Sequence, residues 1–436
     1  MEREWRELAN FTNKFREIRG IRPFAKFALK VVTYFVTATV YTSMEEDRMK
    51  RIALLVLIAS LWLTACGQKF DCSDPLSCVT VGSGESVTIA VALTLSGPDA
   101  PYGIDALRGV ELAIADRGKL LSHPIELIQE DDQCSPEGGQ AAAERLAQNP
   151  KVLGVIGATC SGASETAAKV LTEAGMVLIS PSSTAASLTS EKSHQAGFLR
   201  TIQNDKSQAS MVAKFAYDAL GARTMATIHD GGSYANELQA EACSVFEALG
   251  GKCVKQVLLE SGTNPADALK AISLLAPEAL YYPVYTVDGV AITREAAHAG
   301  MANVALISSD GLLSKDFVSQ TKKFSEGMYM SGPSVLKIDA SFYEKYEARY
   351  GEKPIAVYAA QAYDAAMMLF DAIESTAKTT GRDIYIPRQN LRAALFATDG
   401  FQGLSGTLTC SPLGDCAAPN VVIYQVRGLE FAPIYP

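Results

Sequence analysis

Two short turns rich in hydroxyl groups hold the side chains whose types and spacing suggest chemistry. One turn follows the apolar run 152–156 and contains Ser161, and the other follows the apolar run 177–179 and contains Ser182 and Thr184. Hydroxyl groups beside the free N–H groups of a helix start can bind a carboxylate or another small anion. We therefore predict that Ser161, Ser182 and Thr184 hold the carboxylate of a small ligand. Ser and Thr are also frequent as N-caps and turn residues, and both roles share this sequence pattern.

The segments around these turns have the pattern of parallel strands joined by a helix. The runs 152–156 and 177–179 are apolar and too short for helices, which is typical of buried parallel strands. Between them, residues 161–173 have apolar side chains at helical spacing, including Ala167 and Leu171. Because ligands bind outside the carboxyl ends of such strands, we predict that both turns lie at the ligand-binding edge of one sheet.

Residues 49–65 have the pattern of a lipoprotein signal peptide. A basic start at Met49 precedes the apolar run 52–63, which is well short of the ~20 residues needed to span a bilayer. The run leads into Leu-Thr-Ala-Cys, which resembles the bacterial lipobox, where the chain is cut and a lipid is attached to the Cys, here Cys66. Residues 1–48 precede this complete signal. Either translation begins at Met49, or 1–48 is a true extension with an interfacial amphipathic helix.

The rest of the sequence predicts an exported protein with two lobes. About 370 residues follow Cys66 in the 436-residue chain, which suits two lobes better than one core. We expect residues 66–86 to form a polar tether between the lipid anchor and the folded part. The net charge of −9, without a basic stripe, argues against a nucleic-acid partner.

Eight of the nine Cys occur in close pairs, which are Cys72/Cys78, Cys134/Cys160, Cys243/Cys253 and Cys410/Cys416. Eight Cys allow 105 pairings, so spacing alone does not fix the connectivity. The export signal and the short separations favour these four disulfides, which would place the folded part outside the cytoplasm. A zinc site is the alternative, but no Cys-x-x-Cys occurs and no His lies at ligand spacing from another. We expect no metal and no cofactor.

Strands and helices alternate from residue 87 onward, which indicates an α/β fold with parallel sheets covered on both faces. The predicted strands are 87–95, 125–128, 152–156, 177–179, 225–228, 254–258, 279–282 and 304–307. They form two blocks, 87–200 and 201–331, which we interpret as two Rossmann-like lobes. The helices 340–350, 356–376 and 387–397 and the strands 404–409 and 421–426 are predicted to follow.

The chain is predicted to cross between the lobes more than once. We assign 87–200 plus 332–418 to lobe one and 201–331 plus 419–436 to lobe two. The crossings form a multi-strand hinge, and we expect its segments near 200–204, 331–335 and 400–420.

Several short motifs, taken in order, resemble the type I periplasmic binding proteins, and specifically the Leu/Ile/Val-type binding proteins of ABC importers. The motifs are Ser96-Gly97-Pro98 with Tyr102-Gly103, Asp131-Asp132-x-Cys134-x-Pro136, Gly157-Ala-Thr-Cys160-Ser161, Ser180-Pro181-x-x-Thr184, His229-Asp230 with Tyr234, Tyr281-Tyr282-x-x-Tyr285 and Asp310-Gly311. The resemblance covers about 87–430 and includes a disulfide that matches Cys134–Cys160. It implies a monomeric, lipid-anchored extracytoplasmic protein that takes a small amino acid to a membrane permease and its ATPase.

The resemblance also assigns roles to individual residues. Ser161 and Thr184, with the backbone N–H groups near Ser182 and Ser183, match the residues that take the ligand α-carboxylate. Asp310 matches the acidic residue for the α-ammonium. Tyr285 matches the aromatic residue of the second lobe that closes over the ligand. Tyr102 matches a residue of the side-chain pocket, and Tyr234 matches a residue of the cleft.

Two departures from the family pattern put the side-chain specificity in doubt. Asp310 stands where the Leu/Ile/Val-binding proteins have Glu, and Ser182-Ser183 replaces a Gly-Ala pair, which we expect to make that rim more polar. A small polar amino acid, an amino-acid derivative or an amide is therefore an alternative ligand. Asp310-Gly311 also fits an ordinary turn, and Tyr285 also fits a packed aromatic residue.

The sequence argues against an enzyme. It has no Gly-x-Ser-x-Gly around Ser161, no Walker A motif and no His-Glu-x-x-His. The main alternative to an importer component is a lipid-anchored sensor of the same fold that acts on a signalling partner. A structural lipoprotein with a degraded cleft is a third possibility, which the complete set of predicted ligand residues disfavours.

Overall fold

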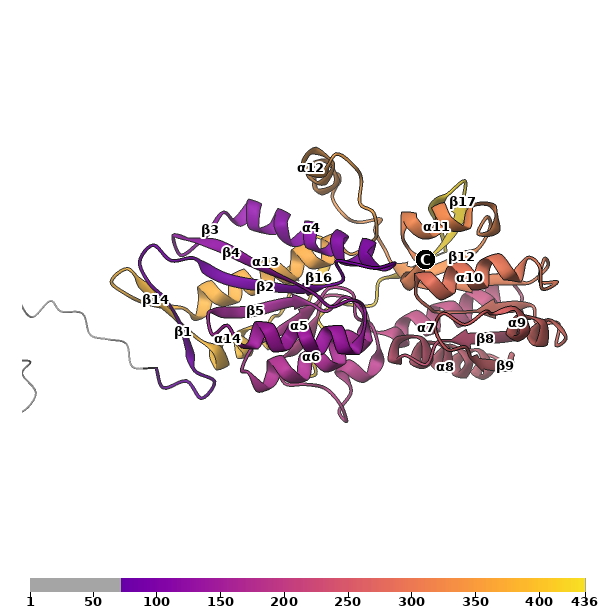
Figure 1. Cartoon of the computed structure of the whole chain (residues 1–436), viewed down its shortest axis with the longest axis horizontal. Helices are drawn as coiled ribbons and strands as arrows, with labels where there is room; N and C mark the ends of the chain where they lie inside the picture. Colours follow the sequence, from indigo (N-terminus) through magenta and orange to yellow (C-terminus); the bar gives the residue numbers. More distant parts are fainter. Residues whose placement is uncertain (1–71, 436) are drawn as a thin grey trace, which may run out of the picture. The chain divides into compact units, whose positions relative to one another are not determined.

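The computed structural model describes residues 72–435 (Figure 1). The predictions for 1–48, for the signal peptide 49–65 and for Cys66 lie outside the described residues. Within the described part, no helix is long and apolar enough to cross a membrane. The described residues also contain no cluster of three or more His, Cys, Asp or Glu side chains that could hold a metal ion.

The first sheet has six strands in the order β3-β4-β2-β5-β6-β7. Its strands are β2 (Val87–Leu93), β3 (Lys119–Leu120), β4 (His123–Asp131), β5 (Val152–Gly157), β6 (Leu178–Ser180) and β7 (Phe198–Arg200). All neighbouring strands are parallel except β3, which pairs antiparallel with β4. This sheet carries both hydroxyl-rich turns at the carboxyl ends of β5 and β6, as predicted.

Helices cover both faces of the six-stranded sheet (Figure 1). One face carries α4 (Ala100–Arg117) and α13 (Ala359–Thr376), and the other carries α5 (Pro136–Ala147) and α6 (Ser161–Glu173). Successive side chains of β2 point to opposite faces of the sheet, which explains this arrangement. Ile89 and Val91 belong to the core with α4 and α13, whereas Ala90 and Ala92 belong to the core with α5 and α6.

The second sheet has seven strands in the order β18-β17-β12-β11-β10-β8-β9. Its strands are β8 (Thr224–His229), β9 (Lys252–Leu258), β10 (Ala279–Tyr281), β11 (Ala305–Ser308), β12 (Tyr329–Pro333), β17 (Val421–Arg427) and β18 (Glu430–Tyr435). The five strands β12, β11, β10, β8 and β9 are parallel to one another, and β17 and β18 add an antiparallel edge next to β12. The α/β fold with mainly parallel sheets is therefore confirmed.

One helix of the second lobe precedes β8, and the others come from the segments between strands of the second sheet. They are α7 (Asp205–Lys214), which continues as a π-helix over Phe215–Ala219, α8 (Ser233–Ala248), α9 (Ala266–Ser273), α10 (Thr286–Ala296) and α11 (Lys315–Thr321). Short 3-10 turns cover Ala186–Thr189, Asp310–Leu312 and Lys322–Phe324. The chain passes between the two sheets after β7, after β12 and before β17, which corresponds to three crossings.

The remaining elements correct part of the sequence-based interpretation. The predicted tether 66–86 contains β1 (Cys78–Val81), which pairs with β14 (Asp383–Pro387), and β14 pairs with β13 (Lys378–Thr380). The predicted strand 404–409 is reduced to β16 (Thr407–Leu408), paired with β15 (Phe401–Gln402). The late helices are α12 (Ala340–Tyr350), α13 and α14 (Arg388–Phe396), close to the predicted ranges.

All four predicted disulfides are present. Cys134–Cys160 joins the turn after β4 to the residue that precedes α6. Cys243–Cys253 joins α8 to β9, and Cys72–Cys78 closes a loop before β1. Cys410–Cys416 closes a loop next to β7.

Candidate ligand-binding site

The two hydroxyl-rich turns are hydrogen-bonded to each other. Ser180 Oγ donates to the Ala158 carbonyl oxygen (2.8 Å), and Ser182 Oγ donates to the Thr159 carbonyl oxygen (2.7 Å). Ser183 Oγ contacts the same Ala158 oxygen at 3.0 Å. The turn after β6 is therefore held against the turn after β5.

These bonds define what each predicted hydroxyl residue does in the structure. The Ser182 and Ser183 side chains are buried and donate to backbone carbonyl groups, so their hydroxyls tie the turns together rather than enlarging a polar rim. Ser161 Oγ accepts a bond from the Ala185 N–H (3.2 Å), at the first turn of α6. The Ser161 hydroxyl thus lies at a helix start beside the second turn, as a carboxylate site requires.

Thr184 differs from its neighbours, because its buried hydroxyl has no hydrogen-bond partner of normal geometry within residues 72–435. Its carbonyl oxygen accepts from the Asp205 N–H (3.0 Å), and its side chain favours the ionised form of the Asp205 carboxyl group. Both Asp205 carboxyl oxygens also lack a partner of normal geometry in this part of the chain. Buried polar groups are usually paired. The Thr184 hydroxyl and the Asp205 carboxyl group are exceptions, so both have unused hydrogen-bonding capacity.

Asp310 begins the 3-10 turn after β11 and is fully buried. Its Oδ1 accepts from Tyr234 OH (2.7 Å) and Gln208 Nε2 (2.8 Å), and its Oδ2 accepts from Tyr358 OH (3.1 Å). Burial raises the pKa of the Asp310 carboxyl group above its ordinary value, and the three donors lower it in part.

Asp205 and Asp310 are neighbouring buried acids. The pKa of Asp205 lies well above its ordinary value, first because the group is buried and then because Asp310 is negative; Arg200 opposes this shift. Asp205 and Asp310 also raise the pKa of the buried Tyr281 hydroxyl, after burial itself. A cation placed beside these two acids would relieve both the burial cost and the repulsion between them.

The predicted aromatic residues surround Asp310 and Gly311. Tyr102 OH, on α4, donates to the Gly311 carbonyl oxygen (2.6 Å). Tyr234 OH accepts from the Gly311 N–H (3.0 Å), and its ring stacks on Tyr285 with 5.1 Å between centroids. The backbone of Ser161 lowers the pKa of Tyr285 against the larger effect of burial, so Tyr285 lies near the first hydroxyl-rich turn. The structure thus brings all three tyrosines to the same region as Asp310.

Sequence reasoning missed four further residues in this region, namely Asp205, Gln208, Tyr281 and Tyr358. Gln208 and Tyr358 come from helices, and each donates directly to Asp310. Tyr281 belongs to the Tyr281-Tyr282-x-x-Tyr285 motif, and the motif itself indicates no role for it. Asp205 gave a signal, since it follows the first crossing and opens α7, but acidic residues are common in the first turn of any helix.

A separate cavity of about 500 Å³ lies beside α12 and the β17–β18 hairpin. Its lining is largely apolar and includes Phe342, Val357 and Phe431. Its buried acid, Asp105, already accepts from Tyr346 OH, Ile355 N–H, Tyr358 N–H and Ala359 N–H. The buried acid of this cavity is therefore already paired, whereas the Asp205 carboxyl group has no partner of normal geometry in the described chain.

The sequence profile of the periplasmic binding protein family matches residues 86–428. The chain belongs to this family. Membership establishes a binding protein rather than an enzyme and implies a location outside the cytoplasm. It also agrees with the predicted fold.

This periplasmic binding protein has curated relatives and solved structural neighbours. It is 24% identical over 350 residues to a leucine-, isoleucine-, valine-, threonine- and alanine-binding protein of Pseudomonas aeruginosa, covering 79% of this chain and 90% of that one. It is 27% identical over 256 residues to the Leu/Ile/Val-binding protein of Escherichia coli, covering 57% and 68%. A leucine-binding protein from Thermotoga maritima has a TM-score of 0.73 at 26% identity, covering 80% of this chain and 97% of that one.

Proposed function

We propose that this protein is the solute-binding lipoprotein of an ABC importer and captures a branched-chain or related small amino acid between its two lobes. The α-carboxylate would be held by Ser161, by Thr184 and by backbone N–H groups of the second turn. The α-ammonium would lie beside Asp310 and Asp205. The names of the relatives from Pseudomonas aeruginosa and Escherichia coli support this ligand class.

One observation carries the proposal. The Thr184 hydroxyl and the Asp205 carboxyl group are buried without partners of normal geometry in the described chain, and Asp310 lies next to them. A hydroxyl for one end of the ligand and acids for the other are what a zwitterion requires, and charge-assisted hydrogen bonds are roughly twice as strong as neutral ones.

Contacts between the lobes support capture by hinge closure. Tyr102 on α4 meets Gly311, the Asp99 carboxyl group accepts from the Thr286 N–H (3.1 Å), and Glu237 accepts from the Ser187 N–H (2.9 Å). Each contact joins a residue of the predicted lobe one to a residue of the predicted lobe two. A ligand drives closure only if it binds the closed form more tightly than the open form.

The experiment is a thermal-shift screen of the folded part from Cys72, with intact disulfides, against the twenty amino acids, amides and short organic acids. A ligand at 100 times its dissociation constant stabilises the folded state by ~2.7 kcal/mol, which is a readable shift. We expect Leu, Ile, Val or a related small amino acid to raise the midpoint of thermal unfolding. Calorimetry then measures the affinity for that amino acid. A shift with organic acids alone would contradict the amino-acid proposal and would leave the fold unchanged.

The lipid anchor is a separate part of the proposal. It rests on the lipobox-like sequence that ends at Cys66. We expect the full chain expressed in a bacterium to partition into detergent and to incorporate a labelled fatty acid, and Cys66→Ser to lose both properties. Equal labelling of the Cys66→Ser chain would exclude Cys66 as the lipid site.

A further inference from the structure

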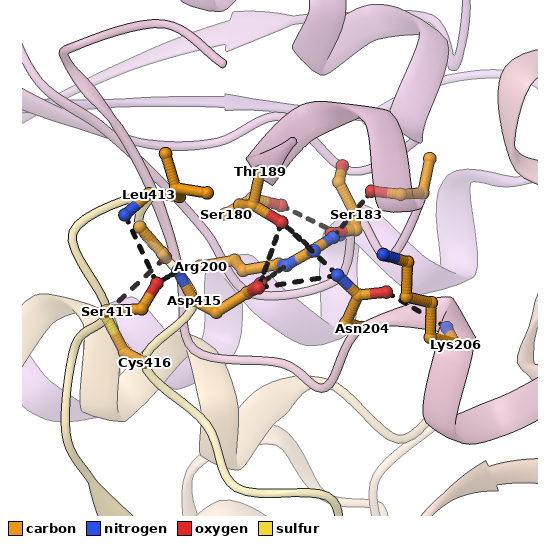
Figure 2. Close-up of polar contacts among 12 residues, drawn as sticks. Ser180, Ser183, Thr189, Arg200, Asn204, Lys206, Ser411, Leu413, Asp415 and Cys416 are labelled. Carbon is orange, nitrogen blue, oxygen red and sulfur yellow. Dashed lines mark hydrogen bonds and ion pairs between the residues drawn. The ribbon is translucent and has the colours of Figure 1, made fainter. Parts of the chain in front are cut away.

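Arg200, the last residue of β7, is a fully buried arginine behind the second hydroxyl-rich turn (Figure 2). Its Nη1 donates to the carbonyl oxygens of Ala185 (2.8 Å) and Ser183 (3.2 Å). Its Nε donates to Asp415 Oδ1 (2.6 Å), and its Nη2 donates to Thr189 Oγ1 (2.5 Å). The guanidinium therefore connects the turn, the end of the following 3-10 helix and the Asp415 carboxylate.

These bonds fix the direction of two peptide groups of the turn, the one that precedes Thr184 and the one that follows Ala185. In a trans peptide unit the C=O and N–H groups point in opposite directions. Because the Ser183 carbonyl group points at Arg200, the N–H group of Thr184 points away from Arg200. The buried guanidinium thus sets the orientation of a backbone donor in the turn that is proposed to hold the ligand carboxylate.

Asp415 is held in place by the loop that the Cys410–Cys416 disulfide closes. Ser411 Oγ accepts from the Asp415 N–H (3.1 Å), and the Arg200 N–H and C=O groups pair with Gly414 O (2.9 Å) and Cys416 N (3.1 Å). Gly414 permits this approach, because its φ is +96° and a Cβ there would lie 2.3 Å from the Phe198 carbonyl oxygen.

Asn204 extends the same cluster to the first crossing between the sheets. Its Nδ2 lies 3.4 Å from Asp415 Oδ2 and 3.3 Å from Thr189 Oγ1. Figure 2 shows Asn204 beside both residues. Its Oδ1 accepts from the Lys206 N–H (3.0 Å) and caps α7, the helix that Asp205 opens. Asp415 therefore contacts both Arg200, which holds the second hydroxyl-rich turn, and the segment that carries Asp205.

We propose that Arg200 and Asp415 are positioning residues for the ligand site, and that the Cys410–Cys416 disulfide fixes the Asp415 end of this pair. The inference rests on the proposed function, because it assigns ligand binding to the turn that contains Thr184. Neither residue touches the ligand. Losing the restraint on Asp415 frees the Arg200 guanidinium, and the turn then samples orientations that do not bind a carboxylate.

The test compares two variants that each lack one of the four disulfides, Cys410→Ser/Cys416→Ser and the matched control Cys72→Ser/Cys78→Ser. Both disulfides have a sequence separation of six, so their removal should reduce stability by similar amounts. The readouts are the unfolding midpoint, the dissociation constant for the amino acid that stabilises the wild type most, and amide hydrogen exchange at 182–186 without ligand. We expect about tenfold weaker binding, equal to about 1.4 kcal/mol, and faster exchange in the first variant only.

A second pair of variants tests the ion pair itself. Asp415 is a third exposed on its side chain, whereas Arg200 is fully buried, so Asp415 is the safer residue to change. Asp415→Asn removes the charge, and Asp415→Glu keeps it. We expect Asp415→Asn to weaken binding about as much as loss of the disulfide, and Asp415→Glu to recover part of the affinity, which a purely structural role would not produce.

The outcomes separate the two proposals. If the wild type binds amino acids, and Asp415→Asn and Cys410→Ser/Cys416→Ser bind as tightly as the matched control, the positioning inference is wrong and the proposed function stands. Equal losses of affinity in both disulfide variants would also overturn the inference, because they would reflect general destabilisation. A wild type that binds no amino acid overturns the proposed function and the inference with it.

Discussion

Asp310 is the residue on which the ammonium end of the proposed site depends. Three side chains donate to its carboxylate from three different elements, namely Gln208 on α7, Tyr234 on α8 and Tyr358 next to α13. These donors fix the orientation of the carboxylate and support its negative charge inside the protein. An acid that is oriented in this way is ready to accept a charged hydrogen bond from an ammonium group.

Replacing Asp310 with Asn should weaken amino-acid binding by about 10- to 100-fold, because the loss of a charged hydrogen bond costs about 1.5–3 kcal/mol. Asn has nearly the same size, so the packing around Tyr234 is retained. Calorimetric titration measures the change. Asp316→Asn, at an exposed acid on α11, is the matched control and should bind like the wild type. An unchanged dissociation constant for Asp310→Asn would remove Asp310 from the site.

Binding should also depend on pH. In the ligand-free protein the pKa of Asp310 is raised, so this group holds a proton to a higher pH than an ordinary Asp does. An ammonium group binds the ionised form, so binding at a pH below the raised pKa of Asp310 expels the proton. We expect affinity to be highest above the raised pKa of Asp310 and to fall as the pH is lowered through it. Titration in two buffers with different protonation enthalpies would show the proton release, and stronger binding at lower pH would contradict this account.

The pH effect on folding has the opposite sign. A carboxyl group with a raised pKa in the folded state contributes stability below its unfolded pKa, and this contribution is lost as the pH rises through the folded pKa. Asp205 and Asp310 both have this direction of shift. The ligand-free site is thus a source of instability at neutral pH, which a cationic group would relieve.

At this scale, sequence reasoning assigned roles to residues that follow strands or belong to the family motifs, and it gave no role to Asp205, Gln208 or Tyr358. Ser161, Thr184 and Asp310 each come just after an apolar strand, where the fold itself places ligand residues. Tyr358 is far from Asp310 in sequence, and it reaches that carboxylate only because α13 returns to the first sheet. No local sequence pattern encodes that approach, so the sequence alone could not assign Tyr358 to the site.

At the scale of elements, the strands of the two sheets could be predicted because buried parallel strands are short apolar runs. Strand β1 was missed because its segment is polar outside Cys78–Val81 and the strand depends on pairing with β14. The predicted strand 404–409 contains Gly406, whose φ of +134° is unsuited to a regular strand. Strand pairing determined that β1 forms, and backbone conformation determined that 404–409 is not one strand. Composition alone predicts neither result.

Helices α4 and α13 pack closely at Gly109, so an added methyl group there should destabilise the protein. A Cβ at Gly109 would lie 2.0 Å from the Ala359 carbonyl oxygen. In an isolated helix, Gly→Ala is favourable by about 1 kcal/mol. We expect Gly109→Ala instead to destabilise the protein by about 1–3 kcal/mol, because the helices must separate. Urea unfolding measures the free energy.

Gly82→Ala is the control for that measurement. Its Cβ would meet nothing nearer than 3.6 Å, so the free energy of unfolding should be almost unchanged. A Gly109→Ala protein as stable as the Gly82→Ala protein would show that α4 and α13 can move apart at little cost.

At the scale of the whole molecule, closure can be observed at a single backbone group. The Thr286 N–H donates to Asp99 Oδ1, which belongs to the other predicted lobe, whereas the Gly289 N–H in the same helix donates to the Tyr285 carbonyl group. We expect saturating amino acid to slow hydrogen exchange at Thr286 by tenfold or more, with little change at Gly289. Equal protection of both amides would indicate general stabilisation instead of closure.

The antiparallel edge of the seven-stranded sheet has a consequence for the order in which the chain is made. Strands β17 and β18 follow every other strand of this sheet in the sequence, and until they are made β12 is an unpaired edge of an otherwise parallel sheet. Exposed edge strands pair readily with other chains. A chain that ends before Val421 would therefore be prone to aggregate. While the chain is being made, this sheet keeps an open edge at β12 until Val421–Arg427 can pair with it.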